Sequence, residues 1–337
     1  MPTFTLPNQI QFFYQDSGAP AGNDNYLTFF IVHGHTYHSN LFLPVLSIGK
    51  SRAHRVILVN RREYSGSTPY SAEELAVFAN GPDDARYKQL IDDGAHLSLL
   101  LDGLIKSLSL PKRVSIVGWS LGNIFTLPMV ASITTLPEDV RARLALHVIR
   151  TIIWDAPSHP MGIRKDAYLP LWDETLPPEA RGVEFGKWLT NYFPHSKLSE
   201  RNFDTLEQRE HDSSRKRTFE DLPMEELFKI IDLSPGSKCD TPLCEPPFAA
   251  MENKVVTEAL FDSKVRQAWG DMKIWHMVGD YNPWNIIFCW WTFEAEVKKA
   301  KSPEPAINFT INKGANHFFM WDYPEACMDK LEFCATS

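Results

Sequence analysis

The sequence predicts an α/β fold with a mostly parallel sheet and helices on both of its faces. Short apolar runs with the length of buried strands alternate along the chain with segments of helical periodicity. Strands of a parallel sheet are buried on both faces and therefore form nearly continuous apolar runs. Alternation of such strands with helices is typical of right-handed crossover connections. One long interval, residues 158–271, interrupts this alternation.

The elements are expected in the following order. An N-terminal hairpin covers residues 4–16, and strands follow at residues 27–32, 56–59, 114–117, 148–154, 274–278 and 307–311. Helices are expected at residues 83–108, 121–130 and 324–334, where apolar residues recur at helical spacing or form a helix-length run. The strands at 27–32, 114–117 and 148–154 each end in short polar or glycine-containing segments, which are candidates for a site.

The interval from residue 158 to residue 271 differs in composition from the rest. It is rich in Trp, Phe, Pro and charge, with helical patches near 180–192 and 224–231. We therefore expect a core formed by residues 1–157 and 272–337, and an inserted, mostly helical cap formed by residues 158–271. The polar stretch 200–217 mixes both charge signs, which favours a solvated segment over a binding patch.

Composition and charge exclude several classes of partner. The 337 residues include 34 basic and 42 acidic ones, a formal charge of −8, which argues against nucleic acid as a partner. No apolar run approaches the roughly 18 residues of a membrane span, and no secretory signal is recognisable. Five cysteines without a C-x-x-C pair favour reduced thiols in a cytoplasmic protein. No cofactor or metal is expected, and the oligomeric state stays open.

The chemistry-bearing stretch is Gly118-Trp119-Ser120-Leu121-Gly122, which follows the strand at 114–117 and precedes an apolar helix. This is the G-x-S-x-G pattern in a strand–turn–helix context. We expect a turn so tight that a Cβ at either glycine would collide with a neighbouring strand or helix. Such a turn raises the hydroxyl of Ser120 above the sheet, next to the positive end of the following helix. Ser120 is therefore the candidate nucleophile.

A serine nucleophile needs a base and donors for an oxyanion. His317, in a Gly-x-x-His loop after the last strand, is the candidate base. The backbone N–H groups of Leu121 and His35 are the candidate oxyanion donors, and His33 is interpreted as a residue that holds its loop. Without the Ser120 turn, all of these would be interpreted as ordinary turn residues.

His33-Gly34, the turn from Gly118 to Gly122 and Gly314-x-x-His317 occur in the order and at the spacing of the α/β-hydrolase superfamily, which the sequence resembles over its whole core. The resemblance implies a mostly parallel eight-stranded α/β-hydrolase sheet, a helical cap inserted after the sixth strand, and a Ser–acid–His triad. It does not extend to the cap.

The acid departs from the usual family pattern. The loop after the strand at 274–278 commonly carries Gly-x-x-Asp-Pro, but here Asn282 occupies the Asp position, and Asp280 stands two residues earlier. The other candidate is Asp155, directly after the strand at 148–154, where the similar fungal lactonases of resorcylic macrolactones carry their acid. We favour Asp155 over Asp280. The competing interpretation of Asp155 is a loop carboxylate that caps nearby N–H groups.

Together these residues favour a serine hydrolase that cleaves a carboxylic ester, lactone or thioester of a small-molecule acyl substrate through an acyl-enzyme. Aromatic residues are candidates for binding a bulky apolar or aromatic substrate, although each one singly is better explained as core; they are Tyr37, Trp119, Trp172 and Trp188. One alternative is an acyltransferase, or a cyclising or eliminating biosynthetic enzyme, on the same triad. The other is a non-catalytic ligand-binding protein with this fold.

Overall fold

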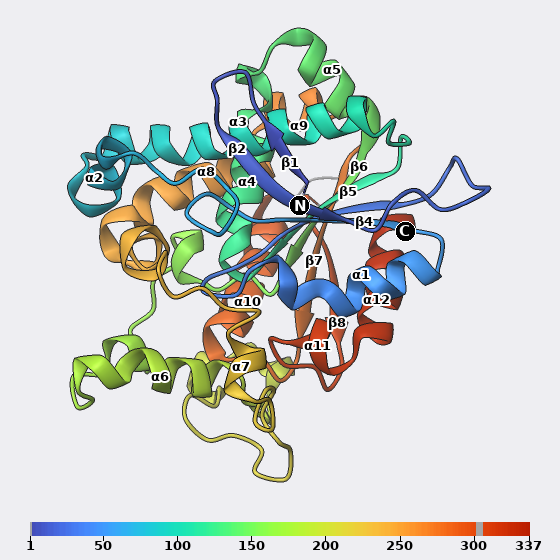
Figure 1. The fold of residues 1–337 in the computed structure, drawn as a ribbon. Helices are drawn as coiled ribbons and strands as arrows, with labels where there is room; N and C mark the ends of the chain where they lie inside the picture. Colours follow the sequence, from blue (N-terminus) through green and yellow to red (C-terminus); the bar gives the residue numbers. More distant parts are fainter. Residues whose placement is uncertain (1, 301–305) are drawn as a thin grey trace.

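A computed structural model describes residues 2–300 and 306–337, and its centre is a twisted sheet of eight strands (Figure 1). In sheet order β1-β2-β4-β3-β5-β6-β7-β8, β1 and β2 are antiparallel to their neighbours and the other pairs are parallel. The strands are β1 (Thr3–Thr5), β2 (Gln11–Asp16), β3 (Thr28–Val32), β4 (Arg55–Val59), β5 (Val114–Trp119), β6 (Val148–Trp154), β7 (Lys273–Gly279) and β8 (Asn308–Asn312). The predicted mostly parallel sheet is confirmed.

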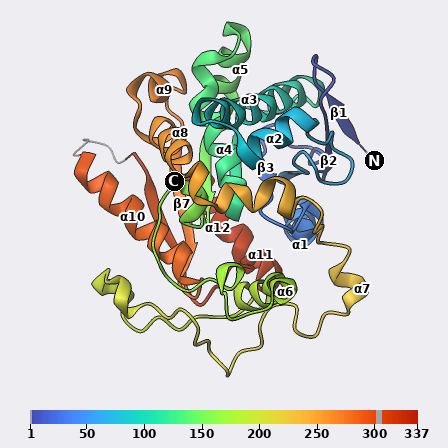
Figure 2. The ribbon, with the colours of Figure 1, turned by 90° about the vertical axis from the view of Figure 1, so that its left-hand side faces the viewer.

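Helices cover both faces of this sheet (Figures 1 and 2). They are α1 (Leu43–Ser51), α2 (Ala72–Asn80), α3 (Asp83–Ser107), α4 (Asn123–Ala131), α5 (Glu138–His147), α6 (Pro178–Leu189), α7 (Met224–Leu227), α8 (Ala249–Phe261), α9 (Ser263–Ala268), α10 (Trp284–Ala300), α11 (Phe319–Asp322) and α12 (Pro324–Thr336). None of the helices in the described part of the chain is both long enough and apolar enough to cross a membrane.

Alternation of side chains along β3 divides the core between the two faces. Phe30 and Val32 pack in one buried cluster with residues of α3 and α4, whereas Phe29 and Ile31 pack in a second cluster with residues of α1 and α12. Every residue of β3, β4 and β5 is buried, as expected for central parallel strands. The carboxyl ends of β3, β5, β6 and β7 therefore meet along one edge of the sheet.

The inserted residues 158–271 contain two kinds of structure. The lower part of Figure 1 holds α6, α7 and a long irregular stretch between them. By contrast, α8 lies against α3 and α4, and its Val255, Ala259 and Leu260 belong to the same buried cluster as those helices. Contacts with the loop after β3 come from the segment before α8, for example from Phe219, whose ring stacks on Tyr37. The assignment of the whole interval to one cap stays a prediction.

Candidate active site

The Ser120 turn joins β5 to α4 through a short 3₁₀ turn, Ser120–Gly122. Ser120 has a φ of 56°, in the left-handed region that non-glycine residues rarely adopt. A Cβ at Gly118 would lie 2.3 Å from Thr126 Oγ1 on α4, and one at Gly122 would lie 2.4 Å from the Val32 carbonyl oxygen. Only glycine fits at both places, because the turn brings Gly118 against side chains of α4 and Gly122 against the backbone of β3, as the sequence predicted.

His317 lies beside Ser120, although 197 residues separate them in the chain. The Ser120 hydroxyl oxygen is 2.9 Å from His317 Nε2, within hydrogen-bond distance. The Trp119 indole stacks on the imidazole with ring centroids 4.6 Å apart and donates a 3.1 Å hydrogen bond to the His317 carbonyl. Trp119 thus fixes both the plane and the backbone position of the imidazole.

Asp155, directly after β6, lies on the other side of the imidazole. Its Oδ2 is 3.5 Å from His317 Nδ1, and both side chains are fully buried. Its Oδ1 accepts hydrogen bonds from the Gly279 N–H at 3.0 Å and from the Asn282 amide at 2.8 Å. Burial raises the pKa of Asp155, while His317, Gly279 and Asn282 act in the opposite direction. Asn282, which occupies the usual acid position, therefore supports Asp155.

Asp280 is not brought to His317. Its carboxylate accepts a 2.6 Å hydrogen bond from the Gly314 N–H and so joins the loops after β7 and β8. Burial raises the pKa of Asp280, and its hydrogen bond with Gly314 counteracts this effect. Of the two candidate acids, only Asp155 contacts the imidazole.

The loop from His33 to Thr36, after β3, passes directly over Ser120. A Cβ at Gly34 would lie 2.7 Å from Ser120 Cβ and 3.1 Å from its Oγ. The His35 N–H makes no hydrogen bond with any described residue. Leu121 follows Ser120 in the first turn after β5, where backbone N–H groups have no partner within the helix. Both candidate oxyanion donors thus flank the serine.

His33 is held as a neutral imidazole. Its Nδ1 donates to the Gly34 carbonyl at 2.9 Å, and its Nε2 accepts the Arg61 N–H at 3.1 Å. Burial and the nearby Arg61 guanidinium lower the pKa of His33 well below its usual range. His33 therefore shapes the loop and is not a proton carrier.

A buried network that the sequence did not suggest supports this loop. Arg61, Tyr64 and Asp240 join there, and Asp240 comes from the inserted segment. Burial alone would raise the pKa of Asp240, but Arg61 brings it down to about 2, so the carboxylate is charged. Arg61 and Tyr64 follow β4 as ordinary loop residues, and no spacing connects them with Asp240.

The four aromatic residues singled out from the sequence are distributed unevenly. Tyr37 and Trp119 meet edge-to-face at 6.2 Å beside the imidazole, together with Phe318 and with Phe219, whose ring stacks on Tyr37 at 5.7 Å. Ser120 itself is only 7% exposed. Phe219 lies in the irregular part of the insertion and belongs to no sequence motif.

The two cap tryptophans lie farther out. Trp188 on α6 is buried, donates to the Gln208 carbonyl at 2.7 Å and stacks on Phe185, whose ring meets that of His35 at 6.4 Å. Trp172 is 37% exposed, and its aromatic contact is with His159. Trp188 is therefore connected to the His35 loop through one ring, whereas Trp172 is not.

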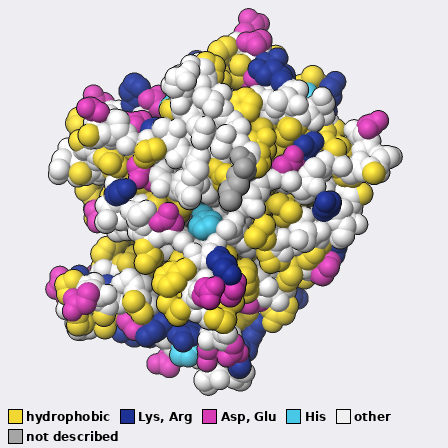
Figure 3. Space-filling view, in the orientation of Figure 1, with side chains coloured by type: hydrophobic (Ala, Val, Ile, Leu, Met, Phe, Trp, Pro, Cys, Tyr) yellow, Lys and Arg dark blue, Asp and Glu magenta, His cyan; other side chains and the backbone are white. Residues whose placement is uncertain are grey.

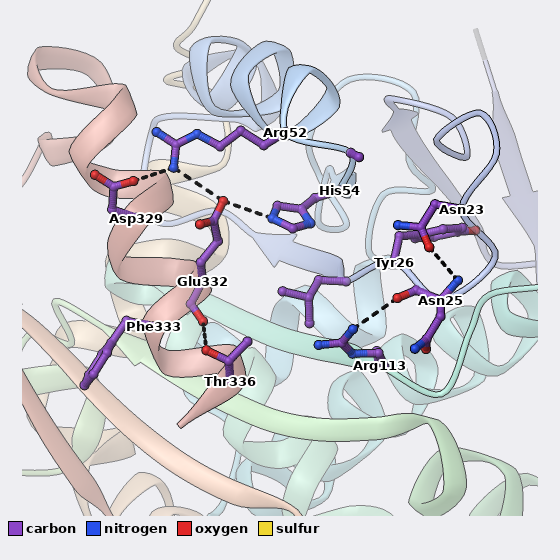
Figure 4. Close-up of a pocket in the computed structure, with 12 residues that line it drawn as sticks. Asn23, Asn25, Tyr26, Arg52, His54, Arg113, Asp329, Glu332, Phe333 and Thr336 are labelled. Atoms are coloured by element: carbon purple, nitrogen blue, oxygen red, sulfur yellow. Dashed lines mark hydrogen bonds and ion pairs between the residues drawn. The ribbon is translucent and has the colours of Figure 1, made fainter.

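A surface hollow of about 550 Å³ lies at the opposite edge of the sheet (Figure 4). Tyr26, His54 and Arg113 at its wall stand just before β3, β4 and β5. Polar groups at its wall bind each other, for example Arg52 with Glu332 at 3.4 Å and the Arg113 guanidinium with the Asn25 carbonyl at 3.1 Å. The face seen in Figure 3 carries charges of both signs interspersed. Ligands of open parallel sheets bind at the carboxyl ends of the strands, so this hollow is no part of the Ser120 site.

The described residues contain no group of three or more His, Cys, Asp or Glu side chains placed to hold a metal ion.

The profile of the alpha/beta hydrolase family matches residues 29–330, which is most of the chain. The chain belongs to the alpha/beta hydrolase family. Two solved structures of this fold are similar at a TM-score of 0.57 and 12% identity. One is an esterase from Exiguobacterium antarcticum, matched over 99% of each chain, and the other is a laboratory-evolved variant of potato epoxide hydrolase, matched over 98% of each. No curated protein matches the sequence. The similarity establishes an alpha/beta hydrolase fold, and the reaction has to be inferred from the site residues.

Proposed function

We propose that the protein is a serine hydrolase that cleaves a carboxylic ester or lactone of a bulky apolar or aromatic substrate. The observation that carries the proposal is the continuous contact from Ser120 Oγ to His317 Nε2 at 2.9 Å and from His317 Nδ1 to Asp155 at 3.5 Å. A serine in this position attacks carbonyl carbon and forms an acyl ester. The rings of Tyr37 and Phe219, which pack next to Trp119, favour an apolar acyl group.

The reaction follows from these positions. His317 Nε2 accepts the Ser120 proton as Oγ attacks the carbonyl, and Asp155 stabilises the imidazolium through Nδ1–H. The N–H groups of Leu121 and His35 bind the oxyanion. The imidazolium then gives its proton to the leaving alkoxide. Water, deprotonated by His317, cleaves the acyl-enzyme and frees Ser120.

The test is Ser120→Ala, assayed with a p-nitrophenyl ester and with a fluorophosphonate probe. We expect the wild type to hydrolyse the ester and to be labelled covalently at Ser120, and the variant to do neither while its circular dichroism spectrum is unchanged. Turnover retained by a folded Ser120→Ala sample would overturn the assignment. Wild type that is neither labelled nor active would instead support a ligand-binding role.

Acyl transfer on the same triad is the second candidate, and the low exposure of Ser120 favours it. A site that admits little water lets an alcohol compete for the acyl-enzyme. The ratio of transesterified to hydrolysed product, measured at increasing alcohol concentration, separates the two. A product that stays free acid at high alcohol concentration would identify hydrolysis as the reaction.

A further inference from the structure

A buried ion pair outside the proposed triad joins the inserted segment to the loop above Ser120. Arg61 Nη1 and Nη2 donate to the two carboxylate oxygens of Asp240 at 3.0 and 2.8 Å. The side chains are 1% and 0% exposed. Desolvation of two charges usually offsets their attraction, so a pair of this kind is weakly explained by stability alone.

The remaining donors of Arg61 bind the backbone of the loop. Nε donates to the His33 carbonyl at 3.1 Å, and Nη2 donates to the Gly34 carbonyl at 2.9 Å. The Gly34 carbonyl and the His35 N–H belong to one planar trans peptide, in which C=O and N–H point in opposite directions. Fixing the Gly34 oxygen therefore fixes the direction of the His35 N–H, which has no hydrogen-bond partner among the described residues.

Further links from the same network hold both sides of this peptide. The Tyr64 hydroxyl donates to Asp240 at 2.5 Å and accepts the Thr36 N–H at 2.9 Å. The hydroxyl of Thr241, next to Asp240, is 3.0 Å from the His35 Nε2. The loop is thus connected to the insertion directly through His35 and Thr241, and indirectly through Arg61 and Tyr64, which both bind Asp240.

We propose that Arg61 and Asp240 are positioning residues for the oxyanion: Asp240 aims the guanidinium, and the guanidinium orients the Gly34–His35 peptide so that the His35 N–H faces the developing charge. The donor is then in place only when the segment that carries Asp240 is docked on the core. This inference rests on the proposed function, because it assigns an oxyanion to that N–H.

The test is Asp240→Asn, with kcat expressed per site titrated to completion by the fluorophosphonate. We expect kcat to fall about 10- to 100-fold with KM changed by less than about threefold, as for a displaced oxyanion donor. The inhibition constant of a trifluoromethyl ketone, whose adduct with Ser120 carries an oxyanion, should rise by the factor by which kcat/KM falls. If Asp240 has a merely structural role, fewer sites should be titrated, but the inhibition constant and kcat/KM of the remaining sites should stay as in the wild type.

The matched control is Asp16→Asn. Asp16 pairs bidentately with Arg55 at 2.6 and 2.8 Å, with side chains 16% and 6% exposed, at the opposite edge of the sheet. Both variants should lower the Tm, but Asp16→Asn should keep the kcat per site and the inhibition constant of the wild type. An equal loss of kcat per site in the control would overturn the proposal.

Tyr64→Phe decides the question if Asp240→Asn does not fold. It leaves the ion pair intact and removes the hydroxyl that links Asp240 to the Thr36 N–H. We expect kcat and ketone affinity to fall together, by less than in Asp240→Asn. If both variants fold and neither changes these two quantities, or if only KM changes, the proposal is wrong. The proposed function would then still stand, provided that wild type is labelled and Ser120→Ala is not.

Discussion

The side-chain amide of Asn282 donates a 2.8 Å hydrogen bond to Oδ1 of Asp155 and a second one, at 2.9 Å, to the Gly279 carbonyl. Asn282 follows β7 and Asp155 follows the adjacent strand β6, so this hydrogen bond joins the loops after two neighbouring strands. The amide occupies the place where a carboxylate is usual and holds the carboxylate of the neighbouring strand. Oδ2 of Asp155 is left to face His317.

The first prediction concerns this acid. Asp155→Asn should lower kcat by about 10³- to 10⁴-fold, because an amide favours the wrong imidazole tautomer and cannot stabilise the imidazolium. Asp280→Asn is the matched control and should lower kcat far less, since Asp280 binds the Gly314 N–H and not His317. Both are measured with one ester, with folding checked by circular dichroism. A near-normal Asp155→Asn beside an inactive Asp280→Asn would reverse the assignment.

The second prediction uses the space above the serine. Gly34→Ala should lower kcat by at least about 10²-fold, because the new methyl group would lie 2.7 Å from Ser120 Cβ and 3.1 Å from the Trp119 ring and must displace them. Gly182→Ala on α6 is the control, because no atom lies within 4 Å of its added Cβ. It should keep kcat and raise stability by about 0.5–1 kcal/mol. Normal turnover of Gly34→Ala would contradict the prediction that activity depends on the close approach of Gly34 to Ser120.

The third prediction concerns substrate selection by the insertion. Trp188→Ala should change the ranking of acyl substrates more than the turnover of a short ester, because Trp188 supports Phe185 against His35. Trp172→Ala should leave the ranking nearly unchanged, because Trp172 packs on His159 at the surface. The measurement is kcat/KM for short, branched and aromatic esters. Equal losses for all esters in Trp188→Ala would contradict this role.

The fourth prediction concerns Glu252 on α8. Its side chain is fully buried, both oxygens lack a hydrogen-bond partner among the described residues, and the Arg164 guanidinium is 3.9 Å away. Burial raises the pKa of Glu252 well above its usual range, and Arg164 only partly opposes this. Between the unfolded and folded pKa values the folded state binds more protons, so stability falls as pH rises through that window.

Glu252→Gln should therefore gain stability over the wild type as pH rises above about 4.5, by up to about 1.4 kcal/mol for each pH unit inside the window. Urea unfolding at a series of pH values measures the difference. A difference that does not change with pH would mean that the carboxyl keeps its ordinary pKa in the fold.

Candidate site residues could be predicted from the sequence where they follow a predicted strand closely. The strand that became β6 was predicted at its observed bounds, because an apolar run ends abruptly at Asp155. Ser120 and His317 could be chosen for the same reason, since each follows a strand in a motif with few alternatives. The parallel sheet then brings such positions to one edge without further information.

The contacts from the insertion could not be predicted. Asp240 lies 179 residues from Arg61, in a short turn without periodicity, and neither residue belongs to a motif. Phe219 comes from an irregular segment whose path depends on tertiary contacts, such as the hydrogen bond from Asn316 to Thr218 at 2.9 Å. Trp172 and Trp188 looked equivalent in the sequence, and only packing on the core separates them.

The left-handed backbone of Ser120, with a φ of 56°, is shared by Asp155, with a φ of 47°. A non-glycine residue in this conformation costs about 1–3 kcal/mol. Glycine at either position would relax the chain while removing the proposed nucleophile or the proposed acid. The proposed reaction would therefore run on two side chains that the backbone holds in place at a cost in folding free energy.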